Sequence, residues 1–100
     1  ELQVLIATVG RIVDTAYEVF DKQDMNLTRD VEPLEEIVDE LSKELKRRHV
    51  NRLRLGECTI EMGFILTDLI TSLERIADHA TNIAEWVEFS ITGIHKSSVV

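Results

Sequence analysis

The apolar residues between Met62 and Val87 recur at alternating intervals of four and three, without a slip in the pattern. They are Met62, Leu66, Leu69, Leu73, Ile76, Ala80, Ile83 and Val87. This spacing is typical of one face of an α-helix, and a seven-residue repeat kept over this length predicts packing against nearly parallel or antiparallel neighbours. We therefore expect a helix from Glu57 to Ile91, roughly 50 Å long, with these residues facing the core and Gly93 ending the helix.

Two earlier segments also show helical spacing. The inward residues of the first are Leu2, Leu5, Val9, Ile12, Ala16 and Phe20. Those of the second are Leu34, Ile37, Val38, Leu41 and Leu45. Residues 21–28 break the pattern and predict a loop, after which Thr28 or Asp30 caps the second helix and Pro33 falls in its first turn. Gly56 predicts the turn into the third helix.

The composition agrees with a small helical protein. The 100 residues include one Pro and four Gly, so long segments run without a helix breaker. We therefore predict a single domain over residues 1–100, all-α, with the topology of an up-down three-helix bundle.

Charge and hydropathy exclude several classes of protein. The net charge of −8 argues against nucleic-acid binding, because the phosphate backbone would repel the chain. No apolar run is long enough to cross a bilayer, and no basic stretch followed by an apolar block marks a leader peptide. Cys58 is the single cysteine, so no intrachain disulfide can form. The chain starts with Glu1 and not Met, which is compatible with a segment of a longer protein.

Acidic residues recur at four-residue spacing on two of the predicted helices. Glu74 and Asp78 lie on the third helix, almost opposite its apolar stripe, and Glu85 is in line with them. Glu35 and Asp39 form a matching pair on the second helix, so two antiparallel helices would present both pairs to one outer groove. Like charges at this spacing repel, and a hard cation such as Mg²⁺, Ca²⁺, Mn²⁺ or iron would neutralise them. The spacing alone favours a solvated face.

No arrangement of residues predicts an enzyme. Nucleophilic catalysis needs a nucleophile beside an activating base, and no helical spacing provides one. A di-iron carboxylate bundle needs Glu-x-x-His pairs, and none of His49, His79 and His95 has a Glu three residues before it. We predict that His79 flanks the core and bonds to a neighbouring helix.

Two surface features suggest partners. The stretch from Lys43 to Arg54 holds six basic residues against one acidic residue. It complements the helix dipole, and the functional alternative is contact with anionic lipid or an acidic partner. Phe64 and Trp86 lie off the apolar stripe, which is compatible with ordinary packing at its edge and also suggests a contact within a homodimer.

One run of residues resembles a known family. The run Leu73-Glu-Arg-Ile-Ala-Asp-His-Ala-Thr-Asn-Ile-Ala-Glu85 is similar to the signature ERI-G/A-DH-x-x-NIAE of PhoU-like domains. The stretch His49-Val-Asn-Arg-Leu-Arg-Leu-Gly-Glu-Cys58, followed by Gly63 and Asp68-Leu69, resembles one branch more closely. That branch is the cytoplasmic PhoU-like region at the C-terminus of bacterial sodium/phosphate cotransporters. The resemblance covers residues 30–95 and is specific over 49–89.

The resemblance implies a regulatory, non-enzymatic role in phosphate transport on the cytoplasmic side of the membrane. It implies a metal site at Glu35, Asp39, Glu74 and Asp78, for iron, zinc, magnesium or manganese. Family members called PhoU carry two bundles, whereas this chain has one, so a cluster that needs both would require a homodimer. The expected partner is the transmembrane part of a phosphate transporter. The alternatives are a free-standing regulator of an ABC-type phosphate importer and a structural dimerisation bundle without a ligand.

Overall fold

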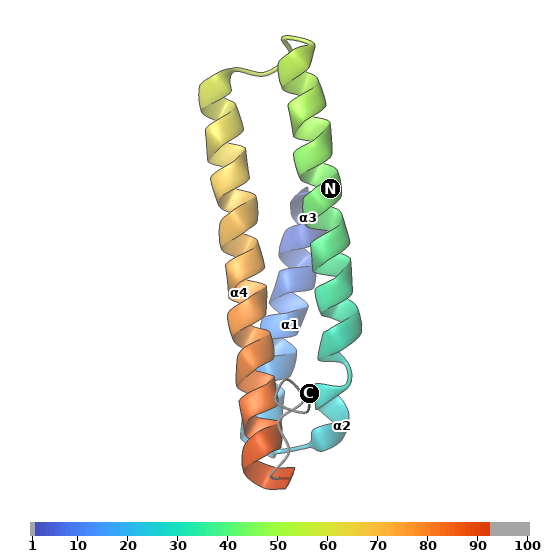
Figure 1. The fold of residues 1–100 in the computed structure, drawn as a ribbon. Helices are drawn as coiled ribbons and strands as arrows, with labels where there is room; N and C mark the ends of the chain where they lie inside the picture. Colours follow the sequence, from blue (N-terminus) through green and yellow to red (C-terminus); the bar gives the residue numbers. More distant parts are fainter. Residues whose placement is uncertain (1, 93–100) are drawn as a thin grey trace, which may run out of the picture.

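Three long helices account for most of the chain. The computed structural model describes residues 2–92, which form α1 (Leu2–Lys22), the single-turn α2 (Met25–Thr28), α3 (Val31–Arg54) and α4 (Ile60–Thr92). α1 and α4 run in the same direction and α3 runs opposite to both (Figure 1). No strand occurs in residues 2–92. The predicted all-α, up-down three-helix bundle is therefore confirmed.

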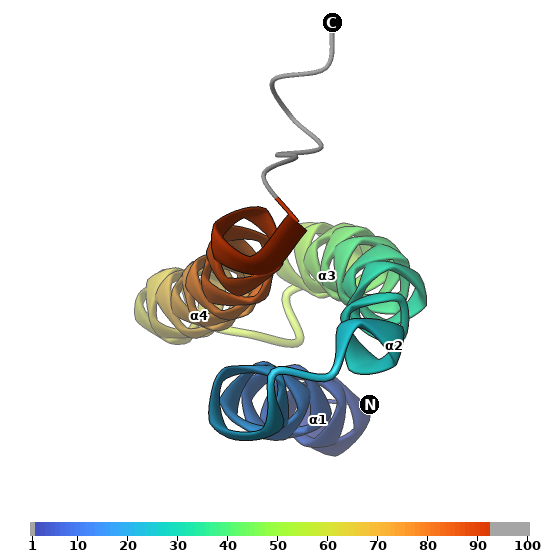
Figure 2. The same cartoon turned by 90° about the horizontal axis from the view of Figure 1, so that it is seen from below.

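The three long helices occupy the corners of a triangle when the bundle is viewed along its axis (Figure 2). The bundle measures 52 × 27 × 18 Å and has one outer face between each pair of helices. None of the helices within residues 2–92 combines the length and the apolar character needed to cross a membrane. The core runs along the bundle axis and consists mainly of Leu5, Val9, Ile12, Ala16, Val19, Val31, Leu34, Val38, Leu45, Ile70, Leu73, Ala77, Ala80 and Ala84.

The predicted inward faces of α1 and α3 are confirmed except for one residue on each helix. Phe20 is 64% exposed, and Val19 is fully buried in its place. Val19 follows Ile12 by seven residues, about two turns, and so stays on the same face, whereas Phe20 is turned a further 100°. On α3, Ile37 is likewise exposed and its neighbour Val38 is buried.

The predicted apolar face of α4 is confirmed in one half and wrong in the other. Leu73 and Ala80 lie in the core and Leu66 and Val87 pack against it, as predicted, but the core face is turned away from the remaining four residues. The residues at every seventh position from 62, called here the outer row, are exposed: Met62, Leu69, Ile76 and Ile83. The adjacent seven-residue row, called here the inner row, is buried: Gly63, Ile70, Ala77 and Ala84. The prediction chose the outer row because its side chains are larger and more hydrophobic than those of the inner row. Small residues permit the close approach of neighbouring helices, and three of the four inner-row residues are Gly or Ala.

The connections follow the predicted pattern with one addition. The predicted loop over residues 21–28 contains α2, and Asp24 caps this turn by accepting a hydrogen bond from the Asn26 backbone N at 2.9 Å. Asp30 occupies the N-cap position of α3 without a side-chain capping bond, and Pro33 lies in the first turn, as predicted. Gly56 has a φ of +73° in the turn after α3, a conformation that favours glycine. The predicted end at Gly93 lies outside the described residues.

Gly63 is needed where α3 meets α4. A Cβ at this position would lie 2.5 Å from Nε2 of His49, whose ring is buried against α4. Neither ring nitrogen of His49 has a hydrogen-bond partner among residues 2–92. The His49 ring thus occupies the space that a side chain at position 63 would need.

Gly63→Ala is expected to lower the free energy of unfolding by about 1 kcal/mol, because overlap with the His49 ring costs about 1–3 kcal/mol and the better helix propensity offsets about 1 kcal/mol. In a His49→Ala background the same substitution is expected to be stabilising, because only the propensity remains. Urea unfolding followed by circular dichroism measures both effects. Gly10→Ala is the matched control: nothing lies within 4 Å of its added Cβ, so it is expected to stabilise in both backgrounds. An equal effect of Gly63→Ala in both backgrounds would contradict the role of His49.

Candidate functional site

An acidic groove lies between α3 and α4. It encloses about 510 Å³ and is lined by Glu32, Glu35, Glu36, Val38 and Asp39 of α3 and by Glu74, Ala77 and Asp78 of α4. Because α3 and α4 are antiparallel, an i, i+4 pair of carboxylates on each helix faces the other across the groove. Six of the eight lining residues are acidic, so the groove concentrates negative charge on one face of the bundle.

The four predicted site residues come together in this groove. Glu35 and Asp39 line it from α3, and Glu74 and Asp78 line it from α4. The predicted direction of the pair on α4 was wrong, however: Glu74 and Asp78 flank the buried Ala77 and do not lie opposite the core. The error follows from choosing the outer row as the core face. Because the inner row faces the core instead, α4 is rotated relative to the prediction, and its two carboxylates lie beside α3. Their role as metal ligands stays a prediction.

Two lysines of α3 pair with acids of the groove. Lys46 Nζ lies 2.8 Å from Glu74 Oε1 and joins α3 to α4. Lys43 Nζ lies 3.1 Å from Asp39 Oδ2 within α3, and both side chains are more than half exposed. Exposed pairs of this kind contribute at most about 1 kcal/mol. The Lys46–Glu74 pair, whose side chains are partly buried, lies on the side of α4 that faces α3.

Sequence reasoning missed Lys46 and Glu36 as groove residues. Lys46 follows Asp39 by seven residues, or about two turns, and this spacing could have placed both on the groove side of α3. Glu36 is turned about 100° from Glu35, and no pattern in the sequence separates it from the exposed acids of α3.

Glu35 is the groove residue whose ionisation the fold disturbs. Burial raises the pKa of its carboxyl above the ordinary value of 4.5. The Thr81 hydroxyl, although outside good hydrogen-bonding geometry in this conformation, lies near enough to lower that pKa. The negative charges of Asp78, Glu85 and Glu32 raise it further. The groove thus holds an electrostatic repulsion that a positive charge would relieve.

A smaller hollow adjoins the groove toward α2. Its lining is Thr28, Val31, Glu32, Thr81, Ala84 and Glu85, and Glu32 is common to both. The hydroxyls of Thr28 and Thr81 are buried there without a hydrogen-bond partner in the described part of the chain. At about 10 Å³ the hollow has room for one water molecule at most. Glu85, predicted to be in line with the acidic pair, thus borders this hollow.

The oxygen ligands are not arranged for a single bare ion in this conformation. Within residues 2–92 no group of three or more His, Cys, Asp or Glu side chains lies close enough to hold one metal ion. The donor set consists of carboxylate oxygens, which suit hard cations such as Mg²⁺. A hydrated cation needs only one or two carboxylates, because water completes its coordination. The groove fits such a cation better than a dehydrated one.

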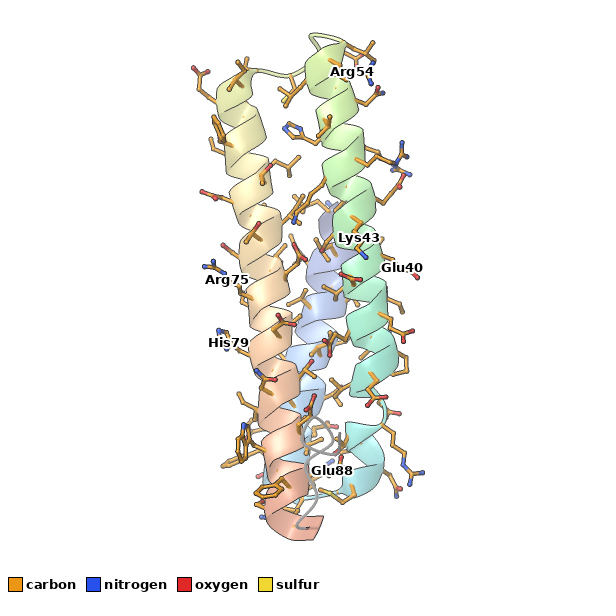
Figure 3. The ribbon with its side chains drawn as sticks, viewed as in Figure 1. Glu40, Lys43, Arg54, Arg75, His79 and Glu88 are labelled. Atoms are coloured by element: carbon orange, nitrogen blue, oxygen red, sulfur yellow. The ribbon has the colours of Figure 1, made fainter. Side chains whose placement is uncertain are left out.

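Two other sequence predictions concern the surroundings of the groove. His79 is exposed and points away from α3 and α1 (Figure 3), so the predicted hydrogen bond to a neighbouring helix is wrong. His79 lies on the side of α4 that faces solvent, because the inner row and not the outer row of α4 faces the core. In the basic stretch, Lys43 and Lys46 pair with groove acids, and Arg47 and Arg48 both pair with Glu44. Four of its six cations are therefore neutralised within the chain.

The family model of the PhoU domain matches residues 2–87, which include α1, α3, the groove and all of α4 except its last five residues. The chain belongs to the PhoU domain family. The resemblance of the run from Leu73 to Glu85 to the PhoU signature therefore extends to the whole bundle.

Several curated relatives of this PhoU domain carry the name of a phosphate-specific transport system accessory protein PhoU homolog. PhoU homolog 1 of Thermotoga maritima is 29% identical over 93 residues, which are 93% of this chain and 40% of the relative. The homolog of Aquifex aeolicus is 30% identical over 82 residues, which are 77% of this chain and 36% of the relative. The homolog of Clostridium acetobutylicum is 25% identical over 75 residues, which are 71% of this chain and 34% of the relative. The chain thus spans two fifths or less of their lengths. No solved structure gives a significant match.

Glu35→Gln is expected to raise the free energy of unfolding of this PhoU domain at pH 7. The folded pKa of Glu35 is raised, so the folded chain binds more protons than the unfolded chain between the two pKa values. The carboxyl therefore destabilises the fold above its folded pKa, and this effect disappears as the pH falls through that pKa toward 4.5. Urea unfolding at a series of pH values, in chelator, should show a flatter pH dependence for the variant.

Glu40→Gln is the matched control for this measurement. Glu40 lies on the same helix, is exposed and points away from the groove (Figure 3). The Glu40→Gln substitution is expected to leave the pH dependence of the free energy of unfolding unchanged from that of the unsubstituted chain. A fall in stability at pH 7 for Glu35→Gln would contradict the repulsion in the groove.

Proposed function

We propose that this PhoU domain is a regulatory, non-enzymatic unit of phosphate transport that binds a hydrated divalent cation in the acidic groove. The supporting observation is the convergence of four predicted carboxylates, Glu35, Asp39, Glu74 and Asp78, on one groove. Membership of the PhoU family and the accessory-protein names of the relatives support the regulatory part. We place the unit at the cytoplasmic side of the membrane, beside the transport part of a phosphate transporter.

The chemistry of the groove narrows the cation. Its oxygen ligands favour magnesium, manganese or iron over zinc, because zinc sites usually include His or Cys ligands and the groove lining has neither. Lys46 supplies one positive charge to Glu74, which leaves the cluster around Glu35 as the part with the larger excess of negative charge. A cation is therefore expected near Glu35 and Asp78, and it would compete with the exposed Lys43 for Asp39.

The groove is placed so that its charge can affect helix packing. Its carboxylates sit on two helices that share one core, and Glu74 is held by Lys46 across the helix pair. Any change in the net charge of the groove changes the repulsion between α3 and α4. This gives a physical route by which a cation signal reaches a partner protein that contacts the bundle. A single bundle is expected to work as a homodimer.

Two settings for this unit remain, and each has support. The stretch from His49 to Cys58 resembles the C-terminal region of sodium/phosphate cotransporters. The relatives' names instead describe accessory proteins of a phosphate-specific transport system, which supports a free-standing regulator. Membrane-spanning segments encoded upstream in the same reading frame would select the cotransporter, and a separate gene would select the regulator. Membrane contact through Lys43 to Arg54 has less support, because four of its six cations are paired.

Asp78→Asn is expected to lower the affinity for Mg²⁺ or Mn²⁺ by more than about tenfold, because it removes a charged oxygen ligand from the groove. Titration calorimetry measures the affinity, and elemental analysis of protein purified without a metal-chelating tag measures the bound metal. Glu40→Gln, which removes the same charge outside the groove, is the matched control and is expected to bind as the unsubstituted chain does. Equal metal content and affinity in Asp78→Asn and the unsubstituted chain would rule out the cation site.

A further inference from the structure

The bundle has three outer faces when viewed along its axis (Figure 2), and the face between α1 and α4 differs in charge from the other two. The α3–α4 face is the acidic groove. On a helical wheel, the α1–α3 face carries charges of both signs: Arg11, Glu18, Lys22, Glu44 and Arg48. By the same construction no Asp, Glu, Lys or Arg of α1 or α4, within residues 2–92, falls on the α1–α4 face. In a chain with a net charge of −8, this is an unusual surface.

The α1–α4 face is also apolar over most of its length. The outer row of α4 consists of four residues that are 39% to 56% exposed. A second seven-residue row, called here the α1 row, consists of Ile6, Val13 and Phe20, which are 41% to 64% exposed. The two rows extend for about 31 Å and about 21 Å. Both helices run in the same direction, so the rows lie along one seam (Figure 1).

The position of both rows follows from the groove. The Lys46–Glu74 pair lies on the side of α4 that faces α3, and the outer row lies on the opposite side of the buried inner row. That side faces α1. On α1 the right-handed turn of the helix places the α1 row on the side toward α4, given the order of the helices around the axis (Figure 2). The two rows therefore border the same face.

We propose that the α1–α4 face is the contact between two copies of this chain, related by a twofold axis. A seven-residue apolar repeat is the pattern by which helices pack on other helices along their length. A face without charges is compatible with its own copy, and it lets two chains of charge −8 meet while their acidic grooves stay on other faces. This inference identifies the surface for the homodimer of the proposed function, and it needs no bound cation.

The size of the face agrees with this contact. A strip two helices wide and about 30 Å long has a flat area of about 600 Å². Two copies would together bury about 1,200 Å², which is the lower end of the range for specific protein–protein interfaces. The matched segment makes up 34% to 40% of each curated relative, so those chains have room for a second bundle of this size in one polypeptide.

The other candidate occupants fit the face less well. Helices that lie on a lipid surface carry Lys and Arg at the border of their apolar side, and anionic lipids repel a chain of net charge −8. Phe64 and Trp86, predicted from the sequence as dimer contacts, are turned to the side of α4 that points away from both neighbours. Trp86 packs edge-on against Phe89 of the same helix, with ring centroids 5.5 Å apart. These residues therefore serve as a control surface.

Sedimentation equilibrium over a range of concentrations tests the proposal. The unsubstituted chain is expected to behave as a dimer, with twice the mass of 11.4 kDa. Ile76→Glu, at the middle of the outer row, is expected to raise the dissociation constant by at least about thirtyfold, because it places a charge in an apolar contact. Phe64→Glu, the same kind of change on the control surface, is expected to alter it by less than about threefold.

Two further measurements keep this test decisive. Ile6→Glu on the α1 row repeats it from the other helix, and circular dichroism establishes that each variant is still helical. All runs are repeated in chelator, and the dimer is expected to persist there, so loss of the cation site alone would leave this result unchanged. A monomer at millimolar concentration would overturn the proposal. Dissociation by Phe64→Glu but not by Ile76→Glu, or flotation of a monomer with lipid vesicles, would also overturn it.

Discussion

The close approach of α4 to its neighbours is the constraint on which the rest of this structure depends. It is permitted by the inner row, in which Gly63, Ala77 and Ala84 replace the larger side chains found elsewhere on α4. At Gly63 the space is taken by the His49 ring, and Ala77 lines the acidic groove. Small residues on one helix thus determine both how the bundle packs and where its carboxylates lie.

The charge of the groove is a consequence of this packing. Once the inner row faces the axis, Glu74 and Asp78 turn toward α3 and meet Glu35 and Asp39 across a partly desolvated space. Burial and neighbouring carboxylates then raise the pKa of Glu35, while Lys46 neutralises Glu74. The large apolar residues of the outer row are left on the opposite flank, where we place the contact with a second copy. One rotation of α4 therefore accounts for the groove, the pKa shift and the uncharged face.

The sequence predicts the architecture well and the rotation of α4 poorly. Helix number, direction and the Gly56 turn follow from periodicity and breakers, because these signals are local. The convergence of the two carboxylate pairs was also predictable, since antiparallel helices align i, i+4 pairs. The core face of α4 was not, because two adjacent seven-residue rows are both apolar, and a pattern scored by hydrophobicity selects Ile76 over Ala77. The small side chain of Ala77 faces the core because it lets the neighbouring helices approach closely. How closely they approach depends on all three helices together and cannot be read from α4 alone. The role of His49 and the Lys46–Glu74 pair likewise depend on that packing.

The central claim is that carboxylates from α3 and α4 share one groove in which a divalent cation is bound. The most direct test is the pKa of the Glu35 side-chain carboxyl, followed by carbon-detected NMR in chelator and again with saturating Mg²⁺. We expect a pKa above 4.5 in chelator, because burial and the neighbouring acids disfavour the ionised form. With Mg²⁺ we expect it to fall, because a cation in the groove favours the ionised form. A pKa at or below 4.5 in chelator would contradict the shared groove, and an unchanged pKa on addition of Mg²⁺ would contradict the cation site.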